Sequence, residues 1–418
     1  MILKLARKSL WNRRGTAILT LVSLAISVAL ILGINHLRHQ AKQSFTSTIS
    51  GTDLIVGARS GQANLLLYSV FRIGNATNNI SWKSYEAIKQ SRDVEWTIPL
   101  SLGDSHRGFR VLGTDHNYFD HYRYGDRRAL AFSAGGPFRS VYDTVFGAQV
   151  ARELGYTIGE KIVIAHGLGD VSFSMHDDKP FTVVGILEPT GTPVDRTVHV
   201  KLEGIEAIHL GWQHGARMPG RDVSAEEALQ RELQPEAITA FLVGLKSRMA
   251  TFRLQRAINE YRKEALTAIL PGVALAELWD VLGMVENMLI VVAFLVLLAT
   301  LVGMTTTLLS SMKERQRELA ILRAVGAHAG YLFALIEIEA LLLAAAGVAL
   351  GILLLSLSLF MLQPWLAAEY GLFISANPLN SEALLITAGV MLLAALLSLI
   401  PAIVAYRRAL ADGLSVRL

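Results

Sequence analysis

Four long apolar stretches alternate with polar segments along the chain. The first contains 18 uncharged residues at positions 17–34, and the second contains 26 at positions 287–312. Two further apolar stretches cover residues 331–361 and 383–406. Because about 20 apolar residues in a helix cross the ~30 Å hydrocarbon core of a bilayer, this pattern predicts four transmembrane helices.

The interval between the first two apolar stretches has a different pattern. Residues 160–167 and 181–200 have the composition of short strands separated by Gly and Pro turns. Three stretches have helical character: residues 82–91, 225–233 and 249–267. Because strand-like and helix-like pieces do not alternate regularly, we expect a large α+β domain with two lobes.

Two segments of this domain are open to more than one interpretation. Residues 212–235 are loop-like and charged, and we expect a mobile insertion there. Residues 249–264 carry the basic side chains Arg253, Arg256, Arg262 and Lys263. This basic segment fits either a stalk that joins the domain to the membrane or a solvated surface helix.

The basic residues predict the orientation of the chain. Five precede the first apolar stretch, four lie between the second and third, three follow the fourth, and none occurs in residues 363–381. Since Lys and Arg concentrate in short cytoplasmic segments, both termini are expected in the cytoplasm and the large domain outside it. The basic, Trp-containing start of the chain fits a helix in the cytoplasmic headgroup layer.

These patterns together predict nine segments. They are a cytoplasmic amphipathic helix at 1–16, a first transmembrane helix at 17–37, an extracytoplasmic domain at 38–282, a second transmembrane helix at 287–312, a cytoplasmic helix at 313–327, a third transmembrane helix at 331–361, an extracytoplasmic loop at 362–382, a fourth transmembrane helix at 383–406 and a cytoplasmic tail at 407–418.

Residues 313–326, KERQRELAILRAVG, separate the second and third predicted spans. Leu319, Leu322 and Val325 recur at helical spacing, and Gly326 provides a helix stop, so a short amphipathic helix is expected. We predict that a soluble partner grips this helix from the cytoplasm. The residues assigned to that contact are Glu314, Arg315, Arg317, Glu318, Leu322, Arg323 and Gly326.

Two pairs of residues in the third predicted span carry further hypotheses. Glu337 and Glu339 are ionisable residues at membrane depth, which are costly there and often functional. Because they lie near the cytoplasmic interface, we expect them to pair with Arg323 or Lys313 or to reach the headgroups. Gly347 and Gly351 form a G-x-x-x-G strip, which predicts a helix-packing surface.

Composition excludes several kinds of chemistry. The chain is 52% hydrophobic and 18% charged, which is typical of membrane proteins, and its net charge is only +4. It contains no cysteine, so a disulfide or a thiolate metal site is excluded. Its 11 histidines do not have zinc-ligand spacing, and we expect solvated surface histidines and no metal. The sequence contains no recognisable catalytic motif. The stretch most similar to a nucleotide-binding phosphate loop, GYTIGEKI at residues 155–162, lacks the Gly-Lys-Ser/Thr core.

The motifs resemble those of the MacB/FtsX-like permeases, the type VII ABC transporter family. The likeness includes the basic start, the large domain, ERQRELAILRAVGA at residues 314–327 and PAIVAYRRALADGL at residues 401–414. The family's E-R-x-R-E-x-x-x-L-R-A-x-G-A pattern is matched at Glu314, Arg315, Arg317, Glu318, Leu322, Arg323, Ala324, Gly326 and Ala327. FTVVGILEPTGTPVDRTVHV at residues 181–200 is similar to the MacB branch, whereas residues 53–75 have no functional assignment.

The resemblance implies partners and cofactors. Two permease subunits, expected as a homodimer, would assemble with two copies of a separate ABC ATPase, which would hold ATP and Mg²⁺. This chain would carry no cofactor, and it would not be an enzyme or a nucleic-acid binder. A periplasmic adaptor and an outer-membrane partner are further expected partners, and the location would be the bacterial inner membrane.

The resulting functional hypothesis is mechanotransmission: ATPase motion would cross the membrane and move the periplasmic domain. The motion would drive export or extraction of a peptide, a small toxic compound or a lipoprotein. The alternative is a regulatory module that activates a periplasmic hydrolase or signals the envelope state. Capture of cargo or of an adaptor by the external domain would favour the first hypothesis, and capture of a cell-wall hydrolase the second.

Overall fold

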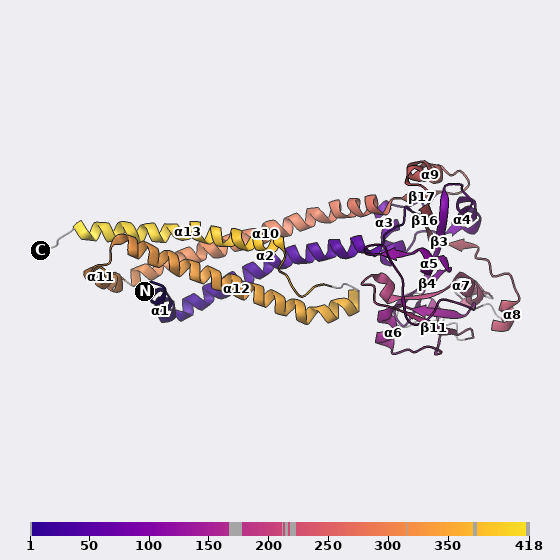
Figure 1. The fold of residues 1–418 in the computed structure, drawn as a ribbon, viewed down its shortest axis with the longest axis horizontal. Coiled ribbons are helices and arrows are strands. Elements are labelled where there is room, and N and C mark those ends of the chain that lie inside the picture. Colours follow the sequence, from indigo (N-terminus) through magenta and orange to yellow (C-terminus); the bar gives the residue numbers. More distant parts are fainter. Residues whose placement is uncertain are drawn as a thin grey trace. The chain divides into compact units, whose positions relative to one another are not determined.

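The computed structural model describes residues 2–166, 178–210, 212–213, 216–217, 223–314, 316–370 and 374–414. It divides into two compact units. The helical unit contains Met1–Ala41, Leu282–Trp365 and Ile374–Leu418, and the sheet unit contains Lys42–Val281 and Leu366–Phe373. Four apolar helices and a mixed α/β domain confirm the expected fold class (Figure 1).

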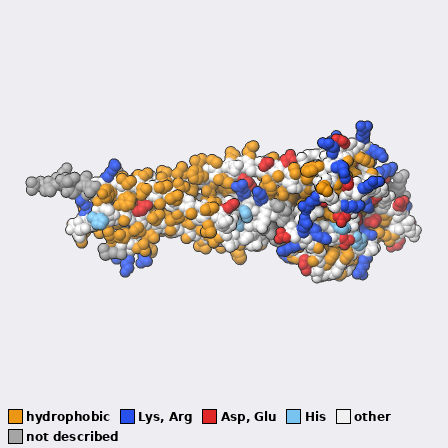
Figure 2. Space-filling view, turned by 45° about the horizontal axis from the view of Figure 1, so that its top comes forward, with side chains coloured by type: hydrophobic (Ala, Val, Ile, Leu, Met, Phe, Trp, Pro, Cys, Tyr) orange, Lys and Arg blue, Asp and Glu red, His pale blue; other side chains and the backbone are white. Residues whose placement is uncertain are grey.

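Six helices lie wholly or partly in the described part of the helical unit. They are α1 (Ile2–Asn12), α2 (Arg14–Thr48), α10 (Pro271–Glu314), α11 (Gln316–Ala324), α12 (Ala329–Tyr370) and α13 (Ser381–Leu414). Within the described residues, four segments are long and apolar enough to cross a bilayer: Arg14–Gln43, Pro271–Met312, Ala329–Leu366 and Ser381–Arg407. Figure 2 shows hydrophobic side chains covering this unit, as expected where lipid replaces water.

The long helices have recognisable starts and lengths. Pro271 occupies the first position of α10, where its missing N–H removes no helical hydrogen bond. At about 1.5 Å per residue, α2 and α10, with 35 and 44 residues, are each longer than the hydrocarbon core is thick. Each helix therefore extends beyond the bilayer core.

Strands are distributed along most of the chain that forms the sheet unit. The strands are β1 (Leu54–Ala58), β2 (Ile80–Ser81), β3 (Val94–His106), β4 (Phe109–Thr114), β5 (Arg123–Tyr124), β6 (Arg128–Ala129), β7 (Phe132–Gly135), β8 (Asp143–Phe146), β9 (Lys161–Ile162), β10 (Ala165–His166), β11 (Phe181–Leu187), β12 (Thr197–Lys201), β13 (Trp212–Gln213), β14 (Ala216–Arg217), β15 (Ala237–Ile238), β16 (Ala240–Leu245) and β17 (Leu266–Ile269). Within the described part of the chain, the main sheet has 11 strands, with a central path β17-β1-β16-β3-β4-β12-β8-β11-β7.

Strand β3 joins two halves of this sheet. Its first half pairs antiparallel with β16, from Val94 opposite Leu245 to Leu100 opposite Ala240. Its second half pairs with β4, and the register shifts between Leu102 and Ser105. Because one 13-residue strand belongs to both halves, the two expected lobes are parts of one continuous sheet.

Short helices cover the sheet and supply separate cores. They are α3 (Gln62–Leu66), the π-helix η1 (Leu67–Phe71), α4 (Trp82–Lys89), α5 (Asn117–His121), α6 (Ala148–Leu154), the 3-10 helix η2 (Pro193–Arg196), α7 (Leu202–His209), α8 (Ala225–Leu229), the 3-10 helix η3 (Arg248–Ala250) and α9 (Thr251–Asn259). Helices α4 and α9 pack on β1, β16 and β17 through Tyr85, Leu254 and Ile258. Burial of each such side chain contributes about 1.5–3 kcal/mol.

The structure bears on the expectations for residues 249–267 and 212–235 of this unit. The helix expected at residues 249–267 ends at Asn259, and Leu266–Ile269 pairs with β1 as strand β17. The stalk interpretation is therefore wrong: α9 is a surface helix with a basic solvent face, and the helix that continues into an apolar span is α10. Within the mobile insertion expected at residues 212–235, positions 214–215 and 218–222 lie outside the described residues. The part that follows contains α8, which has a complete capping box from Ser224 and Glu227.

Candidate functional site

The connection between α10 and α12 is built by helix α11 and its C-terminal cap. Gly326 has a φ of +102°, a left-handed conformation that glycine adopts without strain. The Gly326 N–H donates to the Arg323 carbonyl at 2.9 Å, and the Ala327 N–H donates to the Leu322 carbonyl at 3.0 Å. These two bonds form a Schellman motif, which stops α11 and turns the chain into α12 within a few residues.

Helix α11 leaves apolar side chains uncovered. Ile321 is 63% exposed and Val325 is 83% exposed, and they are four residues apart, on one face. Glu314, Glu318 and Gly326 are also exposed, whereas Leu322 and Arg323 are half-buried. Arg315 and the side chain of Arg317 lie outside the described residues. Ile321 is not among the residues predicted from the sequence, although its four-residue spacing to Val325 is a helical one.

A buried ion pair holds one end of the helical unit together. The Arg13 guanidinium, at the break between α1 and α2, donates to the Glu339 carboxylate of α12 at 3.0 Å. Glu339 is only 1% exposed, and Arg13 also donates to the Ser9 hydroxyl at 3.3 Å. We expected Arg323 or Lys313 to be the partner of these carboxylates. Arg13, 326 positions away in the chain, is a partner that the structure gives for Glu339, whereas the side chain of Lys313 lies outside the described residues.

Glu337 has a different environment from Glu339. Its carboxylate accepts a hydrogen bond from the Ser398 hydroxyl of α13 at 2.9 Å. Two carboxylates that are two residues apart therefore face different helices, since α12 rotates by about 200° over that interval. Glu339 links α12 to the start of α2, and Glu337 links α12 to α13.

The glycines of α12 contact α2 closely. A Cβ at Gly347 would lie 2.7 Å from Leu24, and a Cβ at Gly351 would lie 2.8 Å from the Ala25 carbonyl oxygen. Further along, a Cβ at Gly33 of α2 would lie 3.3 Å from Leu355. The residue numbers rise together on both helices, so α2 and α12 run parallel. The G-x-x-x-G strip packs within the chain, against α2.

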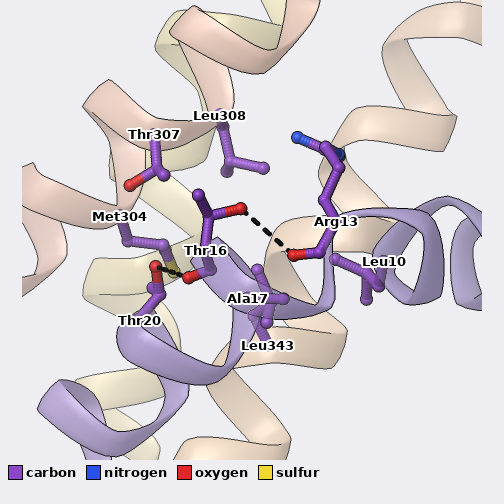
Figure 3. Close-up of a pocket in the computed structure, with 9 residues that line it drawn as sticks. All are labelled: Leu10, Arg13, Thr16, Ala17, Thr20, Met304, Thr307, Leu308 and Leu343. Carbon is purple, nitrogen blue, oxygen red and sulfur yellow. Dashed lines mark hydrogen bonds between the residues drawn. The ribbon is translucent and has the colours of Figure 1, made fainter.

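A small pocket opens beside the Arg13 break (Figure 3). It is lined by Leu10, Arg13, Thr16, Ala17, Thr20, Met304, Thr307, Leu308 and Leu343. The threonine hydroxyls donate to carbonyls of their own helices, as in the Thr16 bond to Arg13 and the Thr20 bond to Thr16. These hydroxyls are therefore satisfied locally, and the pocket is mainly a seam between α2, α10 and α12.

The sheet unit offers no alternative centre for chemistry among its described residues. No group of three or more His, Asp or Glu side chains there could hold a metal ion. The expectation of solvated histidines fails for His106 and His199 of this unit and for His36 of α2 in the helical unit, which are at most 5% exposed. Burial lowers the pKa of His199 to about 3, and its Nδ1 lies 3.2 Å from the Val145 carbonyl oxygen. These histidines are core residues.

Comparison with known proteins agrees with this arrangement. The model of the MacB-like periplasmic core domain matches residues 17–261, and the model of the FtsX-like permease C-terminal domain matches residues 290–410. No curated protein matches the chain.

Two solved structures are also similar to part of the chain. The periplasmic region of MacB from Actinobacillus actinomycetemcomitans is 10% identical, with a TM-score of 0.34, over 55% of this chain and 94% of that one. The extracellular domain of the noncanonic ABC-type transporter YknZ from Gram-positive bacteria is 12% identical, with a TM-score of 0.31, over 52% of this chain and 99% of that one. The family assignment rests on the two sequence models, which together cover both units: the chain belongs to the MacB/FtsX-like family of ABC transporter permeases.

Proposed function

We propose that this permease transmits the motion of a separate ABC ATPase to its large extracytoplasmic domain. Permeases of this family work with ABC ATPase partners in general. Two ATPase copies would hold ATP and Mg²⁺, and two permease chains would form the membrane part. The energy would be used to export or extract a peptide, a small toxic compound or a lipoprotein, together with a periplasmic adaptor and an outer-membrane partner.

The observation that carries this proposal is the exposed face of α11. A nine-residue helix with two exposed branched apolar side chains, Ile321 and Val325, costs free energy in water. A partner groove that covers these side chains recovers that free energy, while the charged residues at the start of α11 bind its rim. The Schellman turn at Gly326 then couples α11 stiffly to α12.

The orientation follows from the distribution of basic residues. The segments before α2, between α10 and α12, and after α13 carry the Lys and Arg residues, so they belong on the cytoplasmic side of the inner membrane. Under this layout a reporter fused after Gly326 reads cytoplasmic and one fused after Gly215 reads external. The opposite result for this pair of fusions overturns the layout.

Co-purification tests the contact at α11. We expect Ile321→Glu, which places a charge in the covered face, to abolish recovery of the ATPase with the tagged permease. Met249→Glu is the matched control, because Met249 is 92% exposed but lies on the sheet domain. The proposal fails if Ile321→Glu retains the ATPase as well as Met249→Glu does.

A charge reversal gives a second test of the same contact. Arg317→Glu combined with Glu318→Lys inverts the charges at the start of α11 without touching its apolar face. We expect a permease that still inserts in the membrane but no longer stimulates ATP hydrolysis. Full ATPase binding and activity in this double variant would count against the proposed grip.

A further inference from the structure

Helices α2 and α12 form a pair whose contacts are of two different kinds. At residues 24–28 of α2 the contact is a glycine strip, in which Gly347 and Gly351 lie against Leu24, Ala25 and Val28. Such a strip permits close approach by van der Waals packing, but it contains no directional bond. By itself, this smooth surface offers little resistance to sliding by a helical turn.

Among the described residues, a buried ion pair lies at the N-terminal end of this helix pair. Arg13 and Glu339 meet at 3.0 Å, and Glu339 is 1% exposed. A slide of one turn would move the carboxylate by about 5.4 Å and break its contact with Arg13, which is unfavourable for a buried charge. Fixing a register is the best-attested use of buried polar and ionic groups.

We propose that Arg13 and Glu339 are positioning residues that fix the register of the parallel helices α2 and α12. The inference rests on the proposed function in one respect, namely that the ATPase applies its force at α11. Since α11 turns directly into α12, displacement of α11 moves α12. The ion pair makes α2 follow α12, instead of letting the glycine strip slip.

The other helix contacts support this division of roles. Glu337 bonds Ser398 of α13 and does not face α2. Helix α10 meets α2 through the Ser27 and Thr300 hydroxyls at 2.9 Å and through the Arg38–Glu286 ion pair at 3.0 Å, in which Arg38 is 45% exposed. An exposed pair contributes little, so it is a weaker constraint than the buried pair at Arg13.

Disulfide trapping in membranes tests the register without any ATPase. The chain has no cysteine, so engineered pairs have no background. Leu24→Cys with Gly347→Cys reports the native register, because a Cβ at Gly347 lies 3.0 Å from the Leu24 Cβ. Leu24→Cys with Gly351→Cys reports a slide of one turn. We expect only the first pair to cross-link when Arg13 and Glu339 are intact.

Breaking the ion pair should change this pattern. In the Glu339→Gln background we expect the one-turn pair to cross-link about tenfold more, with a matching loss at the native pair. Glu337→Gln and Arg14→Gln are matched controls and should leave both yields unchanged. The exchange Arg13→Glu with Glu339→Arg should restore the native pattern. Unchanged yields in Glu339→Gln, or no restoration by the exchange, would overturn the proposal.

Two additions keep the test decisive. If Glu339→Gln does not fold, Arg13→Gln with Glu339→Gln replaces it, because two neutral amides keep hydrogen bonding and lose only the charges. In complex with the ATPase, Glu339→Gln should lose stimulation of hydrolysis, whereas the native-register disulfide should keep it. A disulfide that arrests hydrolysis would show that α2 and α12 must slide. If no ATPase binds, the proposed function fails and the cross-linking result still stands.

Discussion

The sheet unit and the helical unit both depend on glycine, but for different reasons. In the sheet unit, a Cβ at Gly135 would lie 2.0 Å from the Val184 carbonyl oxygen, and one at Gly147 would lie 2.2 Å from the Val194 carbonyl oxygen. In the helical unit, the three atoms nearest to a Cβ at Gly347 all belong to the Leu24 side chain. The backbone atoms near Gly135 and Gly147 cannot move aside, whereas a side chain can rotate.

The difference shows what holds each unit together. The sheet unit buries apolar side chains away from water and pairs its backbone between strands, so its geometry is fixed by hydrogen-bond registers. Helices in lipid have no hydrophobic force between them, and they associate by close packing and polar contacts. Substitutions should therefore be least tolerated where backbone meets backbone and more tolerated where helix meets helix.

The largest effect is expected at Gly135. Its φ of +69° and the nearby Val184 carbonyl oxygen both exclude a side chain. We expect Gly135→Ala to destabilise the sheet unit by about 3 kcal/mol or more, measured by thermal unfolding of the full chain in detergent. Gly136→Ala is the control, since a Cβ at Gly136 has open space. Equal unfolding temperatures for the two variants would remove the basis of the comparison.

A smaller loss is expected where helices meet. Gly351→Ala places a methyl group 2.8 Å from the Ala25 carbonyl oxygen and 2.9 Å from the Val28 Cβ, and the two helices can separate slightly to admit it. We expect a loss of about 1–3 kcal/mol in the same unfolding assay. A Cβ at Gly303 of α10 would meet nothing within 4 Å. Because alanine has a better helix propensity than glycine, Gly303→Ala should leave stability unchanged or slightly raised. A loss at Gly351 as large as that at Gly135 would contradict the comparison.

Asp115 makes the stability of the sheet unit depend on pH. Burial raises the pKa of the Asp115 carboxyl from 3.8 to about 7, against the opposing effect of Lys89. The folded state thus binds this proton more tightly than the unfolded state does. The resulting stabilisation is complete below pH 3.8 and is lost as the pH rises through about 7.

Asp115→Asn removes this dependence. At pH 8 we expect the variant to be more stable than the parent by on the order of 1–2 kcal/mol, with the difference shrinking towards pH 4. Unfolding temperatures measured across that range check the prediction. Asp120→Asn, at an exposed position of the short helix α5 that follows Asp115, should show no such trend. A pH-independent difference for Asp115→Asn would argue against a protonated carboxyl.

The smallest effect is expected at the Arg253–Asp93 ion pair. Its 2.7 Å distance is shorter than that of Arg13–Glu339, yet Arg253 is 72% exposed. Water screens such a pair, so Arg253→Ala should cost at most about 1 kcal/mol in the unfolding assay. Removing Arg13 should cost several times more, because the Glu339 carboxylate that it contacts is buried. Equal costs would mean that burial does not decide the strength of these pairs.

The apolar pattern predicted the helices well because membrane spans need long uninterrupted runs. The strand patterns at residues 181–200 also agree with β11 and β12, where burial alternates along Phe181–Leu187. The helix expected at residues 249–267 was overextended, since Leu266–Ile269 pairs with β1 from the start of the domain. A partner that lies more than 200 residues away leaves no local signal in the sequence.

The candidate sites show the same division between features set by neighbouring residues and features set by distant ones. The amphipathic segment and its Gly326 stop were readable, because helix capping depends on neighbouring residues. The burial of His199 was not, because alternation along a strand does not tell which face the rest of the chain covers. The partners of Glu337 and Glu339 were equally hidden, since each comes from another helix.

The sequence by itself determined the membrane class, the four apolar helices, the large inserted domain and the family. These properties follow from composition and short-range pattern, to which each residue contributes independently of the fold. Only the tertiary structure decided that Glu339 meets Arg13 and that Gly351 meets α2. Such contacts depend on the rotation and register of helices packed side by side, which are set by the summed fit of many side chains.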